Sequence, residues 1–261
     1  MDTEISGKRV FVSGSTQGIG FAVAASLAAE GATIVINGRD GHRVSEALES
    51  LRCLVPGCDV SGIAADVADS GQVSALLDAL EPVDVLVNNV GHFEVSAFEE
   101  ISDAEWSQLF EINVMSGVRL SRHLLKPMLK QRWGRIIFVG TESAVDVPGD
   151  MIHYGATKAA ALALSNGLAK LTRGTGVTVN TVLGGPTYST GVADTVEQIA
   201  SAQSLAPAAL KSTLVRESSL IQRFIEPEEI ANLVTYLASA KSSATNGAAL
   251  RAEGGVLPTT V

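Results

Sequence analysis

The chain has 261 residues, 46% of them hydrophobic and 18% charged, and this composition excludes an intrinsically disordered protein. The length suits one α/β domain with a single substantial core better than two small domains. The formal net charge of −9 disfavours nucleic acid or an anionic membrane as a partner.

Sequence patterns exclude two further classes of protein. No apolar run reaches the length of about 18 residues that a membrane-spanning helix needs, and residues 1–4 lack the basic and then apolar order of a signal peptide. Cys53 and Cys58 are therefore expected to be reduced thiols, and no His/Cys/Asp cluster has the spacing of metal ligands. We expect a cytoplasmic protein that binds no metal.

The first expected strand, Lys8–Ser13, runs directly into a glycine-rich turn and a helical pattern that continues through Ala29. The glycines allow close backbone approach, and the helix N-terminus offers free N–H groups and partial positive charge to a pyrophosphate. An ordinary tight turn is the alternative, but three glycines directly after a strand favour nucleotide binding. The candidate binding residues are Gly14, Ser15, Thr16, Gln17, Gly18, Ile19 and Gly20.

The second expected strand, Thr33–Asn37, is followed by Gly38 and Arg39. Dinucleotide-binding folds place the ribose 2′-position at the end of this strand, where an acid binds a hydroxyl and an arginine accommodates a phosphate. Because an arginine can bind a phosphate through two hydrogen bonds, Arg39 favours NADP(H). NAD(H) is the alternative, since a solvated arginine at a helix start is an ordinary feature.

The next elements alternate regularly between helix and strand. They are a helix at Arg43–Leu51, a strand at Val60–Ala65, a helix at Val73–Leu80 and a strand at Val83–Val87. The last of these is a continuous apolar run, which is typical of a strand buried on both faces. The alternation predicts a parallel sheet with right-handed crossovers.

Polar side chains follow the third and fourth expected strands. Asp66 could meet an adenine amino group, and the amides after Val87 could bind both the neighbouring backbone and a ribose. The candidate cofactor-binding residues in these two turns are Asp66, Val67, Asn88, Val90 and Gly91.

A helical region from Asp103 to Lys130, either one long helix or two stacked helices, carries Asn113 among apolar neighbours. A buried asparagine must find hydrogen-bond partners. Two interpretations stay open: Asn113 fills an irregularity in the helix, or it holds a water near the reacting centre.

A strand expected at Arg135–Gly140 is followed by a helix that begins at Tyr154. Tyr154 and Lys158 lie one turn apart on this helix and therefore share a face. A lysine ammonium beside a phenol favours the phenolate, which predicts that the pKa of Tyr154 falls below its usual value of about 10. A tyrosine tuned in this way can give a proton to a carbonyl or take one from an alcohol.

A strand expected at Val177–Leu183 is followed by a long stretch without strand character, residues 188–225. Short amphipathic helices are expected there at Val192–Gln203 and Ala208–Glu217. A segment of this length at the carboxyl edge of a parallel sheet is usually a lid or a binding element. The chain closes with two more expected elements, a helix at Pro227–Ala238 and a strand at Ala248–Arg251.

In their order and spacing these motifs resemble the short-chain dehydrogenase/reductase (SDR) family over nearly the whole chain. The matching pieces are Gly14–Gly20, Asp66, Asn88–Gly91, Asn113, Tyr154 with Lys158, and the helix that begins Pro227-Glu228-Glu229-Ile230. The resemblance implies an α/β fold, a Rossmann-like doubly wound sheet of seven parallel strands, in a single domain over residues 1–261. Its parts would be a cofactor-binding core (about 1–185), a substrate lid (about 187–225) and a closing helix and strand (226–261).

The resemblance also implies an oxidoreductase that transfers hydride reversibly between a nicotinamide cofactor and a ketone, an aldehyde or a secondary alcohol. Tyr154 would be the acid/base, Lys158 would lower its pKa and bind the ribose, and Asn113 would hold a water that links Lys158 to solvent. Further cofactor-binding candidates, beside Tyr154 and Lys158, are Gly185, Thr187 and Ser189. Since the family often forms tetramers, a homotetramer or a homodimer is expected.

Three positions depart from the pattern of the family. Thr141 stands where the substrate-orienting serine is usual, and Ser143 lies two residues later. We assign the role to Thr141, which keeps a hydroxyl, with Ser143 as the alternative. Gly184 replaces a proline in the turn before the lid, and Val90 replaces an alanine near the cofactor.

The resemblance bears on the cofactor and on rival functions. In the family's pattern the acid that selects NAD would fall at Gly38, and the base that selects NADP would fall at Arg39. This agrees with the electrostatic argument for NADP(H). Two other functions stay open: an NAD-dependent alcohol dehydrogenase of the same fold, and a dinucleotide-binding sensor without catalysis.

Overall fold

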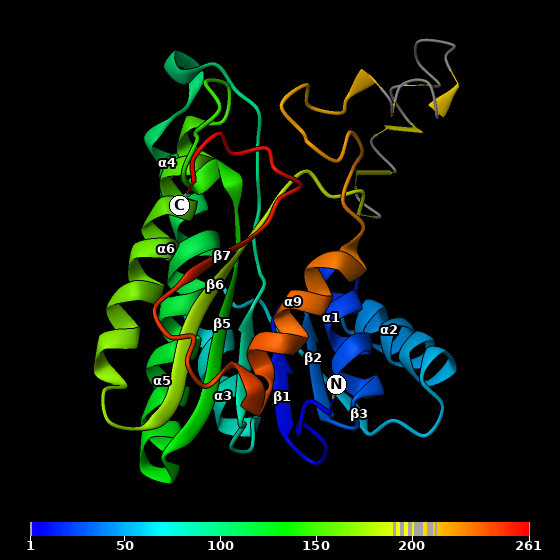
Figure 1. The fold of residues 1–261 in the computed structure, drawn as a ribbon, viewed down its shortest axis with the longest axis vertical. Helices are drawn as coiled ribbons and strands as arrows, with labels where there is room; N and C mark the ends of the chain where they lie inside the picture. The colour runs from blue at the N-terminus through cyan, green and yellow to red at the C-terminus, as the bar shows by residue number, and fades with distance from the viewer. Residues whose placement is uncertain are drawn as a thin grey trace.

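The described residues form one sheet of seven parallel strands, covered by helices on both faces (Figure 1). A computed structural model describes residues 2–189 and 213–260, together with residues 192, 193, 196, 197, 200, 206, 207 and 211. The strand order is β3-β2-β1-β4-β5-β6-β7, and every neighbouring pair is parallel. The expectation of a doubly wound, Rossmann-like α/β sheet is confirmed.

The strands at the centre of the sheet are almost fully buried, as their apolar runs predict. The strands are β1 Arg9–Val12, β2 Thr33–Gly38, β3 Val60–Ala64, β4 Val85–Asn88, β5 Trp133–Thr141, β6 Gly176–Gly184 and β7 Ala249–Ala252. The strands β3 and β7, which form the two edges, are the least buried.

The helices begin and end close to their expected positions. The α-helices among the described residues are α1 Gly18–Ala29, α2 Gly41–Leu54, α3 Ser70–Ala79, α4 Asp103–Phe110, α5 Ser116–Gln131, α6 Ile152–Leu171 and α9 Pro227–Ala238. Short 3-10 turns are η1 Phe98–Glu100, η3 Glu142–Ala144 and η4 Ala240–Ser242. None of the helices in the described part of the chain is long and apolar enough to cross a membrane.

The region around Asn113 is neither one regular helix nor two separate ones. A π-helical turn, Glu111–Met115, joins α4 to α5, and the N–H of Ser116 donates to the carbonyl of Glu111 five residues back. Such wide turns are rare and often lie at functional sites. Asn113 therefore does lie in a helix irregularity, which is one of its two interpretations.

Two expectations about helices are corrected. The helix that carries Tyr154 begins two residues earlier, at Ile152, because the first turn packs the ring of His153 against Trp106 at 5.9 Å between centroids. Of the helices expected at Val192–Gln203 and Ala208–Glu217, half of the residues lie outside the described ones, and the described residues 192, 193, 196, 197, 200, 211 and 213 are helical. Residues 214–217 are described and form turns rather than helix.

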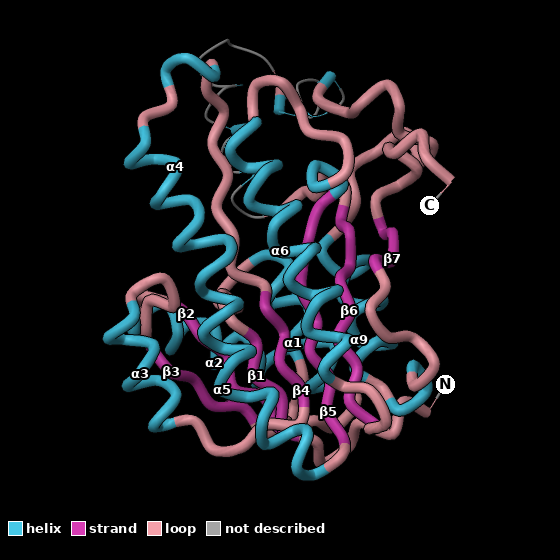
Figure 2. The backbone as a smooth tube through the Cα atoms, turned by 90° about the vertical axis from the view of Figure 1, so that its left-hand side faces the viewer, coloured by secondary structure: helices cyan, strands magenta, loops and turns pink. Residues whose placement is uncertain are grey.

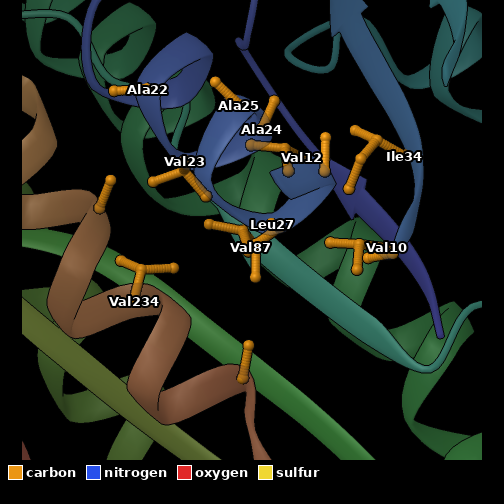
Figure 3. Packing of buried hydrophobic residues seen from close by; sticks show 14 of the residues in the cluster. Val10, Val12, Ala22, Val23, Ala24, Ala25, Leu27, Ile34, Val87 and Val234 are labelled. Atoms are coloured by element: carbon orange, nitrogen blue, oxygen red, sulfur yellow. The ribbon is translucent and has the colours of Figure 1, made fainter. Parts of the chain in front are cut away.

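Two clusters of buried apolar side chains hold the helices on the sheet, one cluster on each face. Helices α1, α2 and α9 cover one face, where Val23 and Leu27 of α1 lie opposite Val234 of α9 (Figure 3). Helices α3, α5 and α6 cover the other face, with Leu120 and Met128 in its core (Figure 2). Each fully buried aliphatic side chain contributes about 1.5–3 kcal/mol, so both layers are fixed firmly.

Parallel strands bring the turns that follow them to one edge of the sheet. Val12 lies beside Ile36 and Val87, and Thr141 lies beside Gly184, so the turns after β1, β2, β4, β5 and β6 are neighbours. The loop after β4 and the chain before α9 extend above this same edge (Figure 1). The edge therefore collects the chain segments that carry the candidate site.

Candidate active site

The glycine-rich turn after β1 forms a narrow cradle at the start of α1. Gly14 and Gly18 have φ angles of 60° and 58°, which favour glycine. A Cβ on Gly20 would lie 2.4 Å from the carbonyl oxygen of Gly14, so only glycine permits this close approach.

The N-terminus of α1 is free to receive an anion. Within the described residues no side chain caps it, whereas Asp40, Asp69 and Ser102 accept first-turn N–H groups of α2, α3 and α4. Free N–H groups and the helix dipole together favour a phosphate. The turn and the helix start thus fit the pyrophosphate of a dinucleotide.

Side chains from β2 and β4 hold this cradle in place. The Nδ2 of Asn89 donates to the carbonyl oxygens of Ser13 at 3.2 Å and Gly14 at 2.8 Å. The Oδ1 of Asn37 accepts the N–H of Gly14 at 3.3 Å, and its Nδ2 donates to the carbonyls of Ile63 in β3 and Ala65 just after it, both at 3.0 Å. The backbone role of the Asn89 amide agrees with expectation. Asn37 was missed, although a polar side chain at the end of a buried strand is a usable signal.

Other cofactor candidates lie around the cradle. Arg39 is exposed directly after β2, and Asp66 is half-buried just past β3. Ser189 packs on the cradle, since its Cβ lies 3.4 Å from the place where a Cβ of Gly18 would be. Gly185 and Thr187 belong to the turn after β6, which leads to Ser189.

The cofactor-binding candidates after β3 and β4 differ in whether their side chains point toward the glycine-rich cradle. Val67 is 2% exposed and belongs to the core. The Nδ2 of Asn88 donates to Ser121 on α5 at 3.2 Å, which turns this side chain away from the cradle. Val90 packs on the cradle, with its Cγ2 2.9 Å from the place where a Cβ of Gly14 would be. Any contact of Asn88 with a cofactor would have to involve its backbone.

Tyr154 and Lys158 share one face of α6, as their spacing predicts. The Nζ of Lys158 lies 5.9 Å from the centre of the Tyr154 ring. Lys158 is 8% exposed, and its Nζ donates to the carbonyl of Val139 at 3.3 Å. A Cβ on Gly91 would lie 2.9 Å from this Nζ, so the loop after β4 lies directly against the ammonium.

Burial shifts the pKa of both groups. Removal of water raises the pKa of Tyr154 to about 12; a hydrogen bond with Thr141 acts against this rise, and the charge of Glu142 adds to it. Removal of water lowers the pKa of Lys158 to about 8. The expected fall in the pKa of Tyr154 is therefore wrong in sign, because desolvation of the phenol is the largest effect on it and raises the pKa.

Of the two candidate hydroxyls, Thr141 is the one that contacts the phenol. Thr141 ends β5 and shares a hydrogen bond with Tyr154. Its Oγ1 donates to Oε2 of Glu142 at 2.5 Å and accepts the N–H of Ser143 at 3.3 Å. The hydroxyl of Ser143 donates to Oε1 of Glu142 at 3.4 Å. This geometry favours Thr141 for the substrate-orienting role, which stays a prediction.

Asn113 joins the loop after β4 to α6. Its Nδ2 donates to the carbonyl of His92 and to Oγ1 of Thr157, both at 2.9 Å, and its Oδ1 accepts the N–H of His92 at 2.7 Å. Both amide hydrogens are therefore in use. A cavity of about 10 Å³, the room that one water needs, lies next to Asn113 and Lys158. A water-holding role for Asn113 stays a prediction.

Two charged residues at this site, Glu142 and Arg216, were not predicted from the sequence. Glu142 is 3% exposed and lies between the two candidate hydroxyls. Arg216, from the chain before α9, brings its Nη2 to 3.1 Å from Oε1 of Glu142. An acid between two hydroxyl residues directly after a buried strand was a signal for Glu142. The sequence holds no comparable signal for Arg216.

A doubly wound sheet with an anion cradle and a phenol–ammonium pair at its carboxyl edge defines a dinucleotide-binding oxidoreductase. Residues 8–200 match the family model described as short chain dehydrogenase, and the chain belongs to this family. It is an oxidoreductase of the kind that acts on CH–OH or carbonyl groups with a nicotinamide dinucleotide.

Similar proteins cover nearly the whole chain. It is 42% identical over 260 residues to the uncharacterized oxidoreductase YvaG of Bacillus subtilis (strain 168), with 98% of each chain covered. It is 30% identical over 257 residues to the 3-oxoacyl-[acyl-carrier-protein] reductase FabG of Escherichia coli (strain K12), covering 96% of this chain and 97% of the relative. The crystal structure of L-sorbose reductase from Gluconobacter frateurii, complexed with NADPH and L-sorbose, is 32% identical, with a TM-score of 0.94 and coverage of 99% and 100%.

Proposed function

We propose that this chain is an NADP(H)-dependent oxidoreductase that interconverts a ketone or aldehyde and the corresponding alcohol, with Tyr154 as the acid/base. The observation that carries the proposal is the Tyr154 phenol, hydrogen-bonded to Thr141, with the buried Lys158 ammonium 5.9 Å from its ring. This group lies at the same edge of the sheet as the dinucleotide cradle. A sensor without catalysis would need the cradle alone.

The residues around the cradle suit each part of the cofactor. The start of α1 would hold the pyrophosphate, Arg39 the 2′-phosphate, Asp66 the adenine and Lys158 the ribose of the nicotinamide. When bound, the nicotinamide supplies or accepts the hydride. NADP(H) is favoured because Arg39 is exposed at the end of β2 and Gly38 offers no acid. The NADPH complex of L-sorbose reductase supports this choice.

Tyr154, Lys158 and Thr141 have different roles in the proposed proton transfer. With a pKa of about 12, Tyr154 carries its proton at neutral pH and can give it to the oxygen of a carbonyl that is being reduced. The positive charge of Lys158 stabilises the phenolate that remains. Thr141, whose hydroxyl donates to Glu142, lies beside the phenol and limits where the reacting oxygen can sit. In the reverse direction Tyr154 takes the proton of the alcohol.

The surroundings of Tyr154 suggest the kind of substrate. Phe93 is 54% exposed and meets the edge of the Tyr154 ring, with 6.1 Å between centroids. An exposed aromatic ring next to the reacting hydroxyl offers an apolar contact surface. We therefore include in the proposal a neutral, partly apolar carbonyl compound as substrate.

Replacement of the phenol tests the proposed function. Tyr154→Phe should lower NADPH oxidation with a panel of ketones and aldehydes by at least about 10²-fold, since it removes the acid/base. The affinity for NADPH, measured by fluorescence titration, should change by less than about threefold, because a hydroxyl outside the cradle contributes little to binding.

Tyr236→Phe is the matched control, because Tyr236 lies on α9, across the sheet from the site, and should keep full activity. Near-complete activity in Tyr154→Phe would exclude Tyr154 as the acid/base. Tight NADPH binding without turnover of any carbonyl in the wild-type protein would favour the sensor.

A further inference from the structure

A chain of hydrogen bonds leads from the proposed acid/base to a buried negative charge. The Glu142 side chain is 4% exposed, and its Oε2 accepts the hydroxyl of Thr141 at 2.5 Å. A carboxylate can only accept, so the Thr141 proton points to Glu142, and the Thr141 side chain also lies within reach of the Tyr154 phenol. The direction of the Thr141 hydroxyl is therefore set by Glu142.

Arg216 supplies the opposite charge from a distant part of the chain. Its Nη2 lies 3.1 Å from Oε1 of Glu142, and its side chain is 35% exposed. An unpaired carboxylate beside Tyr154 would oppose formation of the phenolate, because like charges repel. A buried carboxylate is also unfavourable by itself unless a cation compensates it. The ion pair with Arg216 offsets both effects.

We propose that Glu142 and Arg216 are a pair of positioning residues: Glu142 orients the Thr141 hydroxyl against Tyr154, and Arg216 cancels the charge that would otherwise keep the proton on Tyr154. This inference rests on the proposed function. It makes proton transfer depend on the position of residues 213–226, the chain before α9 that carries Arg216. Loss of Arg216 should make Tyr154 hold its proton more tightly, and loss of the Glu142 charge should make it hold the proton less tightly.

Other charged groups lie on the elements packed around Tyr154. They are Lys158 on α6, the His92–Glu94 pair in the loop after β4, Glu105 on α4, Glu111 paired with Arg119 at the π-helical turn, and Asp146 and Asp150 in the loop after η3. The variants below change none of them. A shift in titration between these variants therefore reports on Glu142 and Arg216.

The pH dependence of alcohol oxidation tests the pair. Oxidation needs the phenolate, so the NADP⁺-dependent rate rises with pH through a midpoint that Tyr154 sets. Glu142→Gln should move this midpoint down by about one pH unit, and Arg216→Gln should move it up by about one pH unit. The double variant should follow Glu142→Gln, because Arg216 acts through Glu142.

A second arginine pair in the same stretch provides the control. Arg223 pairs with Glu229 on the surface at 2.6 Å, so Arg223→Gln removes an equal charge without touching the site and should leave the midpoint in place. Midpoints that move in the same direction in the two single variants, or do not move, would refute the pair. A role in stability alone would lower the rate without these opposite shifts.

Failure of the proposed function would give a different result. In that case the wild-type protein turns over no carbonyl or alcohol, and the pair is tested without turnover. The double variant should lose less thermal stability than the sum of the single variants, and the tyrosinate absorbance that is absent from Tyr154→Phe should appear at lower pH in Glu142→Gln. Additive losses of stability, or an unmoved tyrosinate signal, would count against the inference.

Discussion

At the scale of single residues, the packing of Gly38 against Thr16 bears on the choice between NAD(H) and NADP(H). A Cβ on Gly38 would lie 2.5 Å from Cγ2 of Thr16, so an aspartate at this position needs that methyl group to move. The position that would carry an NAD-selecting acid is thus restricted by packing against Thr16. Arg39, next in the chain, stays exposed and free to meet a phosphate.

Arg39→Ala should weaken the binding of NADPH by about 10- to 100-fold, because a charge-assisted pair with the 2′-phosphate is worth about 1.5–3 kcal/mol. Binding of NADH, which has no such phosphate, should stay unchanged. Fluorescence titration of both nucleotides measures the effect. Arg173→Ala is the control, since Arg173 is exposed in the turn before β6, at the opposite edge of the sheet. An equal loss for both nucleotides would contradict a role in selecting NADP(H).

The identities of several candidate site residues could be predicted from the sequence, but the direction in which the pKa of Tyr154 shifts could not. The spacing of Tyr154 and Lys158 follows from helix geometry, and the structure places both on one face of α6. The pKa direction of Tyr154 was wrong because it depends on the water excluded by packing, which a sequence does not display. Glu142 was missed, although its place between two hydroxyl residues was a signal, because an acid in a loop is usually solvated, whereas here it is buried and pairs with Arg216.

At the scale of elements, Gly20 of α1 and Gly167 of α6 differ in how tightly the chain packs around them. Gly20→Ala should lower the unfolding free energy by about 1–3 kcal/mol and weaken NADPH binding at least about tenfold, since its Cβ would meet the Gly14 carbonyl at 2.4 Å. Thermal unfolding and nucleotide titration measure these changes.

The matched control is Gly167→Ala on the exposed face of the C-terminal part of α6, where a Cβ would meet nothing within 4 Å. This variant should raise stability by about 0.5–1 kcal/mol, because alanine favours a helix more than glycine does. If Gly20→Ala bound NADPH as well as Gly167→Ala does, the cradle would not be the nucleotide site.

The boundaries of regular elements were predictable, and the π-helical turn was not. Strands such as β4 and helices such as α9 follow from apolar runs, a first-turn proline and acidic caps. A single wide turn at Glu111–Met115 shifts the helix register without changing the apolar pattern that surrounds it. Asn113 in this turn contacts His92 and Thr157, which lie in distant segments of the chain. A local sequence pattern therefore does not predict these contacts.

For the whole molecule, the buried pair at the site makes stability depend on pH. The pKa of Lys158 falls from 10.5 to about 8 on folding, so between these values the unfolded chain binds more protons and stability rises with pH. The pKa of Tyr154 rises from 10.0 to about 12, so stability falls again above pH 10. These two groups together favour a maximum near pH 10.

Lys158→Met should remove the rise in stability that the titration of Lys158 causes between about pH 8 and pH 10.5. At pH 7 this variant should be more stable than the wild-type protein, and the difference should shrink by up to about 3 kcal/mol as the pH approaches 10. Denaturant unfolding at several pH values measures the difference. Lys170→Met, at the exposed end of α6, is the control and should run parallel to the wild-type protein. A difference that does not vary with pH would show that the ammonium is not desolvated.

The global topology was predictable because few arrangements satisfy the alternation of strands and helices. Right-handed crossovers and buried apolar strands allow a doubly wound sheet, and the observed strand order agrees with it. The segment expected as a lid gave no such constraint, because the short amphipathic helices expected there do not by themselves join two strands of the sheet. The homotetramer or homodimer stays a prediction.

One further consequence follows from the short bridge between Thr187 and Ile225. The N–H of Tyr188 donates to the Ile225 carbonyl at 2.8 Å, and the N–H of Ile225 donates to the Pro186 carbonyl at 2.9 Å. Backbone hydrogen bonds thus hold Tyr188 and Ile225 side by side. A change in the length of the chain that joins these two residues adds little closure entropy. Insertions or deletions between residues 188 and 225 should therefore leave the register of the strands below unchanged.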